Sequence, residues 1–368
     1  MIMIDNSGII MEAVKEGKKR IPWVDMAKGY GILAIFTGHL VEGTIIGDFV
    51  YSFHLPLFFF LSGYLFKADM SFGKFISKKA RSILLPYFIL GLPVVFFSVY
   101  YPLVFTGLVH KWLVNPAVLW DAFCDGLIKF FIQNRYGTMW YLAVLFGLNI
   151  LAFILAKIPK EPIRLILVIA IASAGIFYYS KGGVALPWNV DVVLTALPFF
   201  WLGYFFSKHD FLYGLILQQA KWKRILLWLL MMTVNIGANI RSFRLTGEGL
   251  EMFWNHYGSP LWVYLSAFAG ILGVVIFSSL FSWKPLTYIG EHSMLFFMWH
   301  QAIFFELWKE MYPRWGIPDI WEYIYAATDP LKLFGGLTAL ILAQIIPTLI
   351  IIWLLVELLR RTPLKRMV

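Results

Sequence analysis

The chain contains little cysteine and little charge. Among its 368 residues there is one cysteine, Cys124, and only 14% of the residues are acidic or basic. A single cysteine excludes an intramolecular disulfide and a metal site built from several thiolates. The low charge excludes an ordinary soluble domain, in which about a quarter of the residues are charged.

Hydrophobic residues take the place of charge. They make up 60% of the chain and gather in runs of roughly 20 residues, the length at which a helix crosses the hydrocarbon core of a lipid bilayer. We predict an all-α integral membrane protein with about ten transmembrane helices. The expected spans are 23–43, 48–66, 82–104, 138–156, 163–180, 190–207, 223–241, 259–281, 287–308 and 334–358.

The basic residues are distributed unequally between the loops that these spans would separate. The net charge is +10, and most lysines and arginines fall in loops on the side of the N-terminus. Cytoplasmic loops of membrane proteins carry such an excess, so both termini are expected in the cytoplasm, and the basicity requires no nucleic-acid partner. The expected parts are a cytoplasmic segment 1–22, a membrane domain 23–358 and a basic cytoplasmic tail 359–368.

The first expected span carries a stripe of polar side chains. Lys28 and His39 are eleven residues apart, a spacing that puts them about 20° apart around a helix and ~16 Å apart along it. Asp25 lies within about 40° of the same face, and Glu42 follows His39 by three residues. A charge that faces lipid costs at least ~2.5 kcal/mol, so the stripe is expected to face a cavity or polar partners.

Two interpretations of this stripe remain open. In the first, Asp25 and Lys28 pair near the cytoplasmic surface, and His39 only reaches toward the outer surface. In the second, His39 acts as a general base, because histidine titrates near neutrality. Lys28 then holds a phosphate-bearing cofactor at the cytoplasmic side.

The segment WVDMAKGYGILAIFTGH, residues 23–39, resembles the first helix of acyltransferase family 3. Members of this family are membrane-embedded enzymes that move acyl groups, mostly acetyl, onto sugars and other acceptors. Their first helix carries an arginine or lysine, ten residues and a histidine, and the resemblance is closest to the fucose 4-O-acetylase-like branch. It continues, in the family's order, in FHLPLFFFLSGYLF (53–66), KKARSILLPYF (78–88), MWYLAVLF (139–146), WNVDVVLTALPFFWLGYFF (188–206) and YIGEHSMLFFMWHQ (288–301).

The resemblance implies an acetyl-CoA donor on the cytoplasmic side and a carbohydrate acceptor, a surface polysaccharide or its precursor, at a bacterial inner membrane. Lys28, Lys78 and Arg81 are implied to bind the phosphates of CoA. The family often has arginine at both positions where this chain has Lys78 and Arg81, and lysine keeps the charge but lacks the planar fork of arginine. No metal is expected, because no local ligand spacing such as HExxH occurs.

His39 is the expected catalytic residue, as a general base or, in the less favoured alternative, as carrier of a transient acyl group. Glu42 is predicted to orient His39 from one turn away, and His54 to join it from the start of the second span. Binding of backbone at the membrane interface is an equal alternative for His54. The side chains expected to contact the acceptor are Asp25, Arg135, Trp140, Asp191 and His300, with an aromatic-belt role as the alternative for Trp140.

Transport is the alternative function. About ten spans with internal charges and broken helices also suit the translocation of a sugar or other small polar substrate. The concentration of charge in the first span and the lack of visible inverted halves favour the enzyme. Three longer connections, 105–137, 242–258 and 309–333, are expected on the outward side, where they could cover a substrate site.

Overall fold

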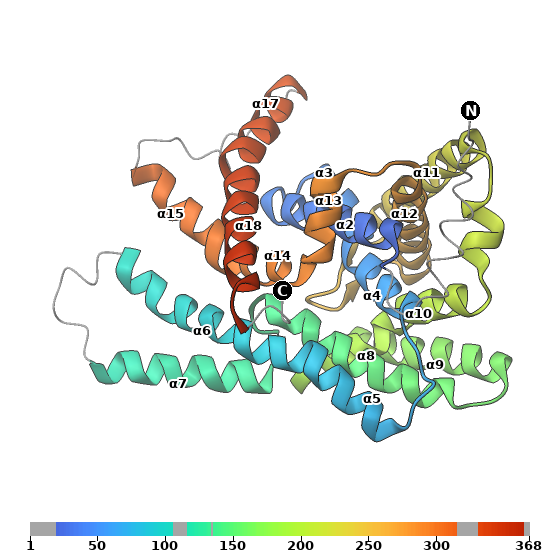
Figure 1. The fold of residues 1–368 in the computed structure, drawn as a ribbon, viewed down its shortest axis with the longest axis horizontal. Coiled ribbons are helices and arrows are strands. Elements are labelled where there is room, and N and C mark those ends of the chain that lie inside the picture. The colour runs from blue at the N-terminus through green and yellow to red at the C-terminus, as the bar shows by residue number, and fades with distance from the viewer. Residues whose placement is uncertain (1–19, 106–115, 134, 315–329, 364–368) are drawn as a thin grey trace.

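A computed structural model describes residues 20–105, 116–133, 135–314 and 330–363, which are almost entirely helical (Figure 1). Most of the expected segment 1–22, the end of the tail 359–368 and parts of the connections 105–137 and 309–333 lie outside the described residues.

The first elements are α2 (Pro22–Leu40), α3 (Ile45–Tyr51), α4 (His54–Tyr64), α5 (Phe72–Lys79), the π-helical turn η1 (Ala80–Leu84), α6 (Leu85–Phe105), α7 (Pro116–Ile132), the 3₁₀ turn η3 (Gly137–Met139), α8 (Trp140–Ala156) and α9 (Glu161–Ser180). They are followed by η4 (Pro187–Asn189), α10 (Val190–Lys208), η5 (Tyr213–Leu217), α11 (Lys221–Thr246), β1 (Leu250–Glu251), β2 (His256–Tyr257), α12 (Pro260–Leu280), α13 (Lys284–Glu291), α14 (Ser293–Trp299), η6 (His300–Phe305), α15 (Glu306–Arg314), α17 (Pro330–Leu340), η7 (Ile341–Ile345) and α18 (Ile346–Arg360).

Within the described residues, eight helical stretches are long and apolar enough to cross a membrane. Each overlaps one of the expected spans, and together they confirm an all-α integral membrane protein that crosses the bilayer several times. The stretches are Ile45–Tyr64, Phe72–Tyr100, Ala117–Ala156, Glu161–Ser180, Pro187–Lys208, Lys221–Thr246, Pro260–Leu280 and Gly335–Arg360.

The other two expected spans look different. α2 is an uninterrupted helix with Asp25 and Lys28 in its first half, and it is not one of the eight stretches. The expected span 287–308 is divided among α13, α14, η6 and α15, because the backbone leaves helical geometry at His292 (φ −109°, ψ 23°). Such a break is tolerated in a membrane protein where neighbouring helices surround it. The structure therefore replaces one expected continuous helix with a broken one.

α2 lies in the middle of the bundle, against α4, α12 and α13 (Figure 1). Its contact with α13 leaves room only for glycine. A Cβ on Gly29 would collide with the carbonyl oxygen of Leu286, and a Cβ on Gly290 would collide with that of Asp25. Small residues permit this close approach of helix backbones in membranes. The contact brings α14 and η6, which follow α13, beside α2.

The two ends of α2 lie near different parts of the chain. At its start, Trp23 packs edge-to-face on Tyr64 at the end of α4, with ring centroids 5.0 Å apart. Beyond its last residue, the short helix α3 leads into α4, which begins at His54. α2 and α4 are therefore antiparallel, and Lys28 and His39 lie toward opposite ends of the bundle. We call these the Lys28 end and the His39 end.

Candidate active site

A cavity of about 350 Å³ lies at the His39 end of the bundle. Its walls come from segments far apart in the sequence: the end of α2, α3, the start of α4, η3 with the start of α8, β1 with the turn that follows it, and α14 with η6. Four side chains singled out from the sequence line it: His39, Glu42, His54 and Trp140. The further lining residues, which sequence reasoning did not single out, include Tyr51, Thr138, Glu251, Phe253, Trp254, Gln301 and Glu306.

His39 is held by a tyrosine. The Tyr51 hydroxyl, at the end of α3, lies 3.1 Å from Nδ1 of His39. Tyr51 is the last residue of α3, which is capped at its start by the Thr44 side chain, the acceptor of a hydrogen bond from the Gly47 N–H. When Nδ1–H donates to the Tyr51 oxygen, Nε2 of the neutral ring carries the lone pair that a general base needs.

Two further histidines surround His39. His54 is buried in the cavity wall, whereas His300 packs behind His39 with ring centroids 5.3 Å apart and does not line the cavity. Nδ1 of His54 lies 2.7 Å from the Val50 carbonyl oxygen, and Nδ1 of His300 lies 2.7 Å from that of Phe297. A carbonyl oxygen only accepts, so each Nδ1 is the protonated nitrogen of its ring. In the neutral rings, the lone pair is on Nε2.

Glu42 lines the cavity but does not continue α2. The helix ends at Leu40, and Val41 has a non-helical backbone (φ −130°, ψ 34°), so Glu42 stands in the turn before α3. The expected geometry, with Glu42 one helical turn beyond His39, is therefore not formed. Tyr51 is the group that the structure places against Nδ1. Nothing in the local pattern around Tyr51 identifies it, because it meets His39 only when α3 folds back over the end of α2.

Arg135 and Asp191 hold the wall of the cavity rather than lining it. Arg135 Nη2 lies 2.5 Å from Asp191 Oδ2, and only 8% and 2% of the two side chains are exposed. The backbone N–H of Leu186 donates to the other Asp191 oxygen, and Arg135 Nε donates to the carbonyl oxygen of Phe253. Phe253 itself lines the cavity. The two residues therefore tie the β1–β2 hairpin to the helix bundle, and neither is among the residues that line the cavity.

The residues expected to bind the donor lie at the other end of α2. Lys28 Nζ is 3.5 Å from Asp25 Oδ1, and 25% of the Lys28 side chain remains exposed. Asp25 is nearly buried in this pair and does not line the cavity. Lys78 on α5 and Arg81 on η1 are exposed, and α5 follows the end of α4, so both belong to the Lys28 end. The Asp25–Lys28 pairing of the first interpretation thus coexists with an exposed basic surface.

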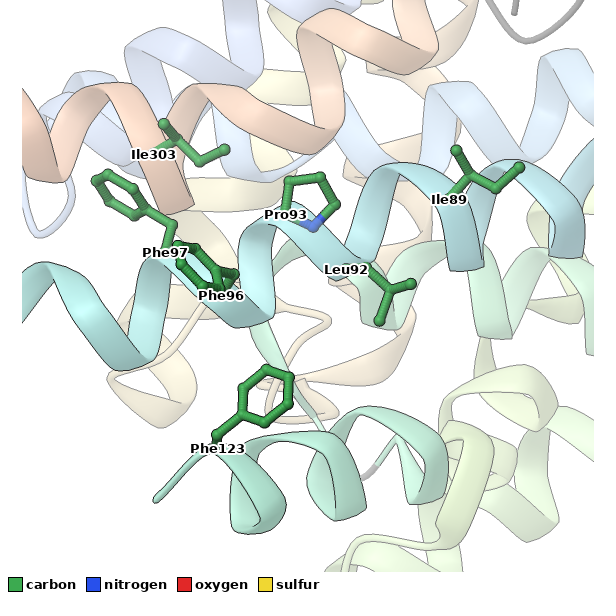
Figure 2. Close-up of a pocket in the computed structure, with 7 residues that line it drawn as sticks. All are labelled: Ile89, Leu92, Pro93, Phe96, Phe97, Phe123 and Ile303. Carbon is green, nitrogen blue, oxygen red and sulfur yellow. The ribbon is translucent and has the colours of Figure 1, made fainter. Parts of the chain in front are cut away.

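A larger cleft of about 630 Å³ lies between α6, α7 and η6, and the described side chains that line it are all hydrophobic (Figure 2). α6 and α7 run side by side along one edge of the molecule (Figure 1). None of these described side chains can transfer a proton or bind a charged group, so they offer no general base for acyl transfer. They are Ile89, Leu92, Pro93, Phe96, Phe97, Phe123 and Ile303.

Comparison with known protein families identifies one match. The model of a family described as an acyltransferase domain matches residues 21–357, nearly the whole chain. The matched region contains the His39 cavity and the basic residues of the Lys28 end. No curated protein and no solved structure matches the chain significantly.

Proposed function

The chain belongs to acyltransferase family 3, and from this premise we propose that it is a transmembrane O-acetyltransferase. It moves an acetyl group from cytoplasmic acetyl-CoA to a hydroxyl of a carbohydrate, a surface polysaccharide or its precursor, at a bacterial inner membrane. The observation that carries the proposal is His39 in the wall of a cavity with its Nδ1 engaged by Tyr51. A base oriented in this way can take a proton from a bound hydroxyl through Nε2.

The reaction is a direct transfer between two bound substrates. Nε2 of His39 removes the proton of the acceptor hydroxyl as its oxygen attacks the thioester carbonyl carbon. The tetrahedral intermediate collapses, the C–S bond breaks, and the CoA sulfur leaves with the proton that His39 carried. Holding both substrates in line supplies much of the acceleration, and the base contributes roughly 10²–10⁴-fold.

The basic residues of the Lys28 end support a donor site there. Lys28, Lys78 and Arg81 offer charged hydrogen-bond donors of the kind that bind phosphates. From Lys28 to His39 the helix rises ~16 Å, a length comparable with an extended pantetheine arm. A CoA molecule with its phosphates at the Lys28 end would lie along α2 and present its thioester to His39.

Purified protein with radiolabelled acetyl-CoA tests the proposal. We expect His39→Ala to lose at least ~100-fold in acetyl transfer to carbohydrate. His209→Ala is the matched control, because His209 lies at the end of α10, contacts Glu161 and does not line the cavity. His209→Ala should transfer acetyl groups at the same rate as the unaltered protein.

Two outcomes contradict the proposal. One is a His39→Ala variant that retains transfer. The other is the accumulation of unmodified sugar inside proteoliposomes without transfer of label, which is the behaviour of a transporter.

A further inference from the structure

The cavity contains a carboxyl group for which the proposed reaction has no role. Glu251 lies on β1, in the connection between α11 and α12 and outside the stretches that cross the membrane. It lines the same cavity as His39. β1 pairs antiparallel with β2, so that Glu251 stands opposite His256. A hairpin with strands of two residues is not stable alone. Contacts with the rest of the protein must therefore hold Glu251 in its position at the cavity.

The hairpin owes its position to the helix bundle. Arg135, already paired with Asp191, donates from Nε to the Phe253 carbonyl oxygen. Thr195 on α10 donates from Oγ1 to Oδ1 of Asn255 at 2.7 Å, and both residues are buried. These bonds come from the bend that precedes η3 and from α10, and they hold both Phe253 and Asn255 in the turn of the hairpin. Glu251 is therefore presented to the cavity by a fixed support.

Only one oxygen of the Glu251 carboxyl is used by the hairpin. Oε1 accepts a hydrogen bond from the Phe253 N–H at 3.0 Å. Among the described residues, the structure gives no hydrogen bond or ion pair to Oε2, and no lysine or arginine lines the cavity. Burial, reinforced by the charge of Glu42, raises the pKa of Glu251 to about 7. Within the described cavity wall, no lysine or arginine is therefore available to neutralise this carboxylate.

Aromatic side chains border the same carboxyl. Phe253 and Trp254 follow it in the turn of the hairpin, and Trp140 faces the cavity from the start of α8. Trp140 and Phe253 pack edge-to-face with ring centroids 5.8 Å apart. A carboxylate can accept hydrogen bonds from the hydroxyls of a sugar, and aromatic rings can pack on the C–H groups of the same sugar ring. This combination is suited to binding a carbohydrate. An anionic sugar would be repelled by this carboxylate without a nearby cation.

We propose that Glu251 binds the acceptor through Oε2, which accepts a hydrogen bond from a sugar hydroxyl, and that it restricts the acceptor to sugars without negative charge. This inference rests on the proposed function, because it assigns the acceptor of the same reaction. Glu251 then determines which acceptor binds, while His39 remains the general base.

The experiment compares Glu251→Gln with Glu248→Gln. Glu248 lies in the same connection, is exposed and does not line the cavity, so its variant removes the same charge from the same loop. The acceptors are a panel of neutral methyl glycosides and the matching methyl glycosiduronates, which add one carboxylate to the same ring. Initial rates with radiolabelled acetyl-CoA give KM for donor and acceptor separately.

We expect the unaltered protein and Glu248→Gln to prefer the neutral glycoside at least ~10-fold in kcat/KM. Glu251→Gln should raise the acceptor KM by about 10-fold or more, since a charge-assisted hydrogen bond is lost. It should leave the acetyl-CoA KM unchanged and reduce the discrimination against the glycosiduronate. Glu251→Asp, which retains the charge, should retain the discrimination.

The outcomes separate the inference from the proposed function. If the unaltered protein acetylates none of the sugars, the proposed function fails and the inference fails with it. If it acetylates a neutral sugar but Glu251→Gln keeps the acceptor KM and the discrimination, the inference alone is overturned. If Glu251→Gln does not fold, the Asp variant decides, because loss of discrimination in that variant also overturns the inference.

Discussion

The two ends of α2 are built in opposite ways. The His39 end is a cavity whose walls come from distant parts of the chain, and His54 in its wall is almost completely buried. The Lys28 end carries basic residues that are exposed or half-exposed and come from α2, α5 and η1. The His39 end thus depends on tertiary packing, whereas the Lys28 end, where we propose that the donor binds, presents individual charges. Variants at the two ends should therefore fail in different ways.

The largest effect is expected from breaking the support of the cavity. Asp191→Asn leaves Arg135 as a buried charge without its partner, a change that typically costs about 3–5 kcal/mol. It also loosens the hairpin that presents Phe253 and Glu251. We expect a marked drop in the melting temperature of the detergent-solubilised protein, together with loss of transfer.

An exposed ion pair provides the control for this variant. Asp125 and Lys129 lie 2.6 Å apart, but about 60% of each side chain is exposed. Solvent screens an exposed pair of this kind, so it contributes little to stability. Asp125→Asn should therefore have a melting temperature close to that of the unaltered protein. Equal melting temperatures for Asp191→Asn and Asp125→Asn would show that the buried pair does not support the cavity.

A smaller and more selective effect is expected at the Lys28 end. Arg81→Ala removes a guanidinium from an exposed surface and should not disturb the fold. If Arg81 holds a CoA phosphate, the KM for acetyl-CoA should rise by about 10-fold to 100-fold, while the acceptor KM stays constant. Lys74→Ala, which removes an exposed charge from neighbouring α5, is the control. If the KM for acetyl-CoA rises equally in both variants, Arg81 contributes only general positive charge to the surface and makes no specific contact with a CoA phosphate.

The sequence predicted the parts of this arrangement that are local. Lys28 and His39 share one uninterrupted helix because their spacing follows the helical repeat, which depends on nothing outside α2. Most of the spans were likewise predictable, since length and hydropathy are properties of single segments. The sequence also indicated His54, Glu42 and Trp140, and these do line the cavity.

The rest depends on contacts between distant segments. Tyr51 and Glu251 reach the cavity only because α3 folds over α2 and because Arg135 and Thr195 anchor the hairpin. No periodicity in the sequence marks either residue. The break at His292 is not visible in the sequence either, because the run around it is mostly apolar, and it lies next to the close contact of α13 with α2.

The smallest effect is expected from a change of pH. It tests whether the two ends of α2 act independently, and it requires no large change of structure. Burial disfavours the charged form of Glu251 and raises its pKa to about 7, so its carboxylate fraction increases as the pH rises through this value. Because an acceptor hydroxyl donates more strongly to a carboxylate than to a carboxylic acid, the acceptor KM should fall several-fold between about pH 6 and pH 8.

Comparison with Glu251→Gln assigns this pH dependence. His39, Glu42 and Glu306 also line the cavity and remain in the variant, so the difference between the two profiles belongs to Glu251. The variant should show a flatter acceptor KM over the same range. The acetyl-CoA KM should change equally with pH in both proteins, because Lys28, Lys78 and Arg81 lie at the opposite end of α2. If the donor KM instead follows the Glu251 substitution, the two ends do not act independently, and the acceptor and donor sites must overlap.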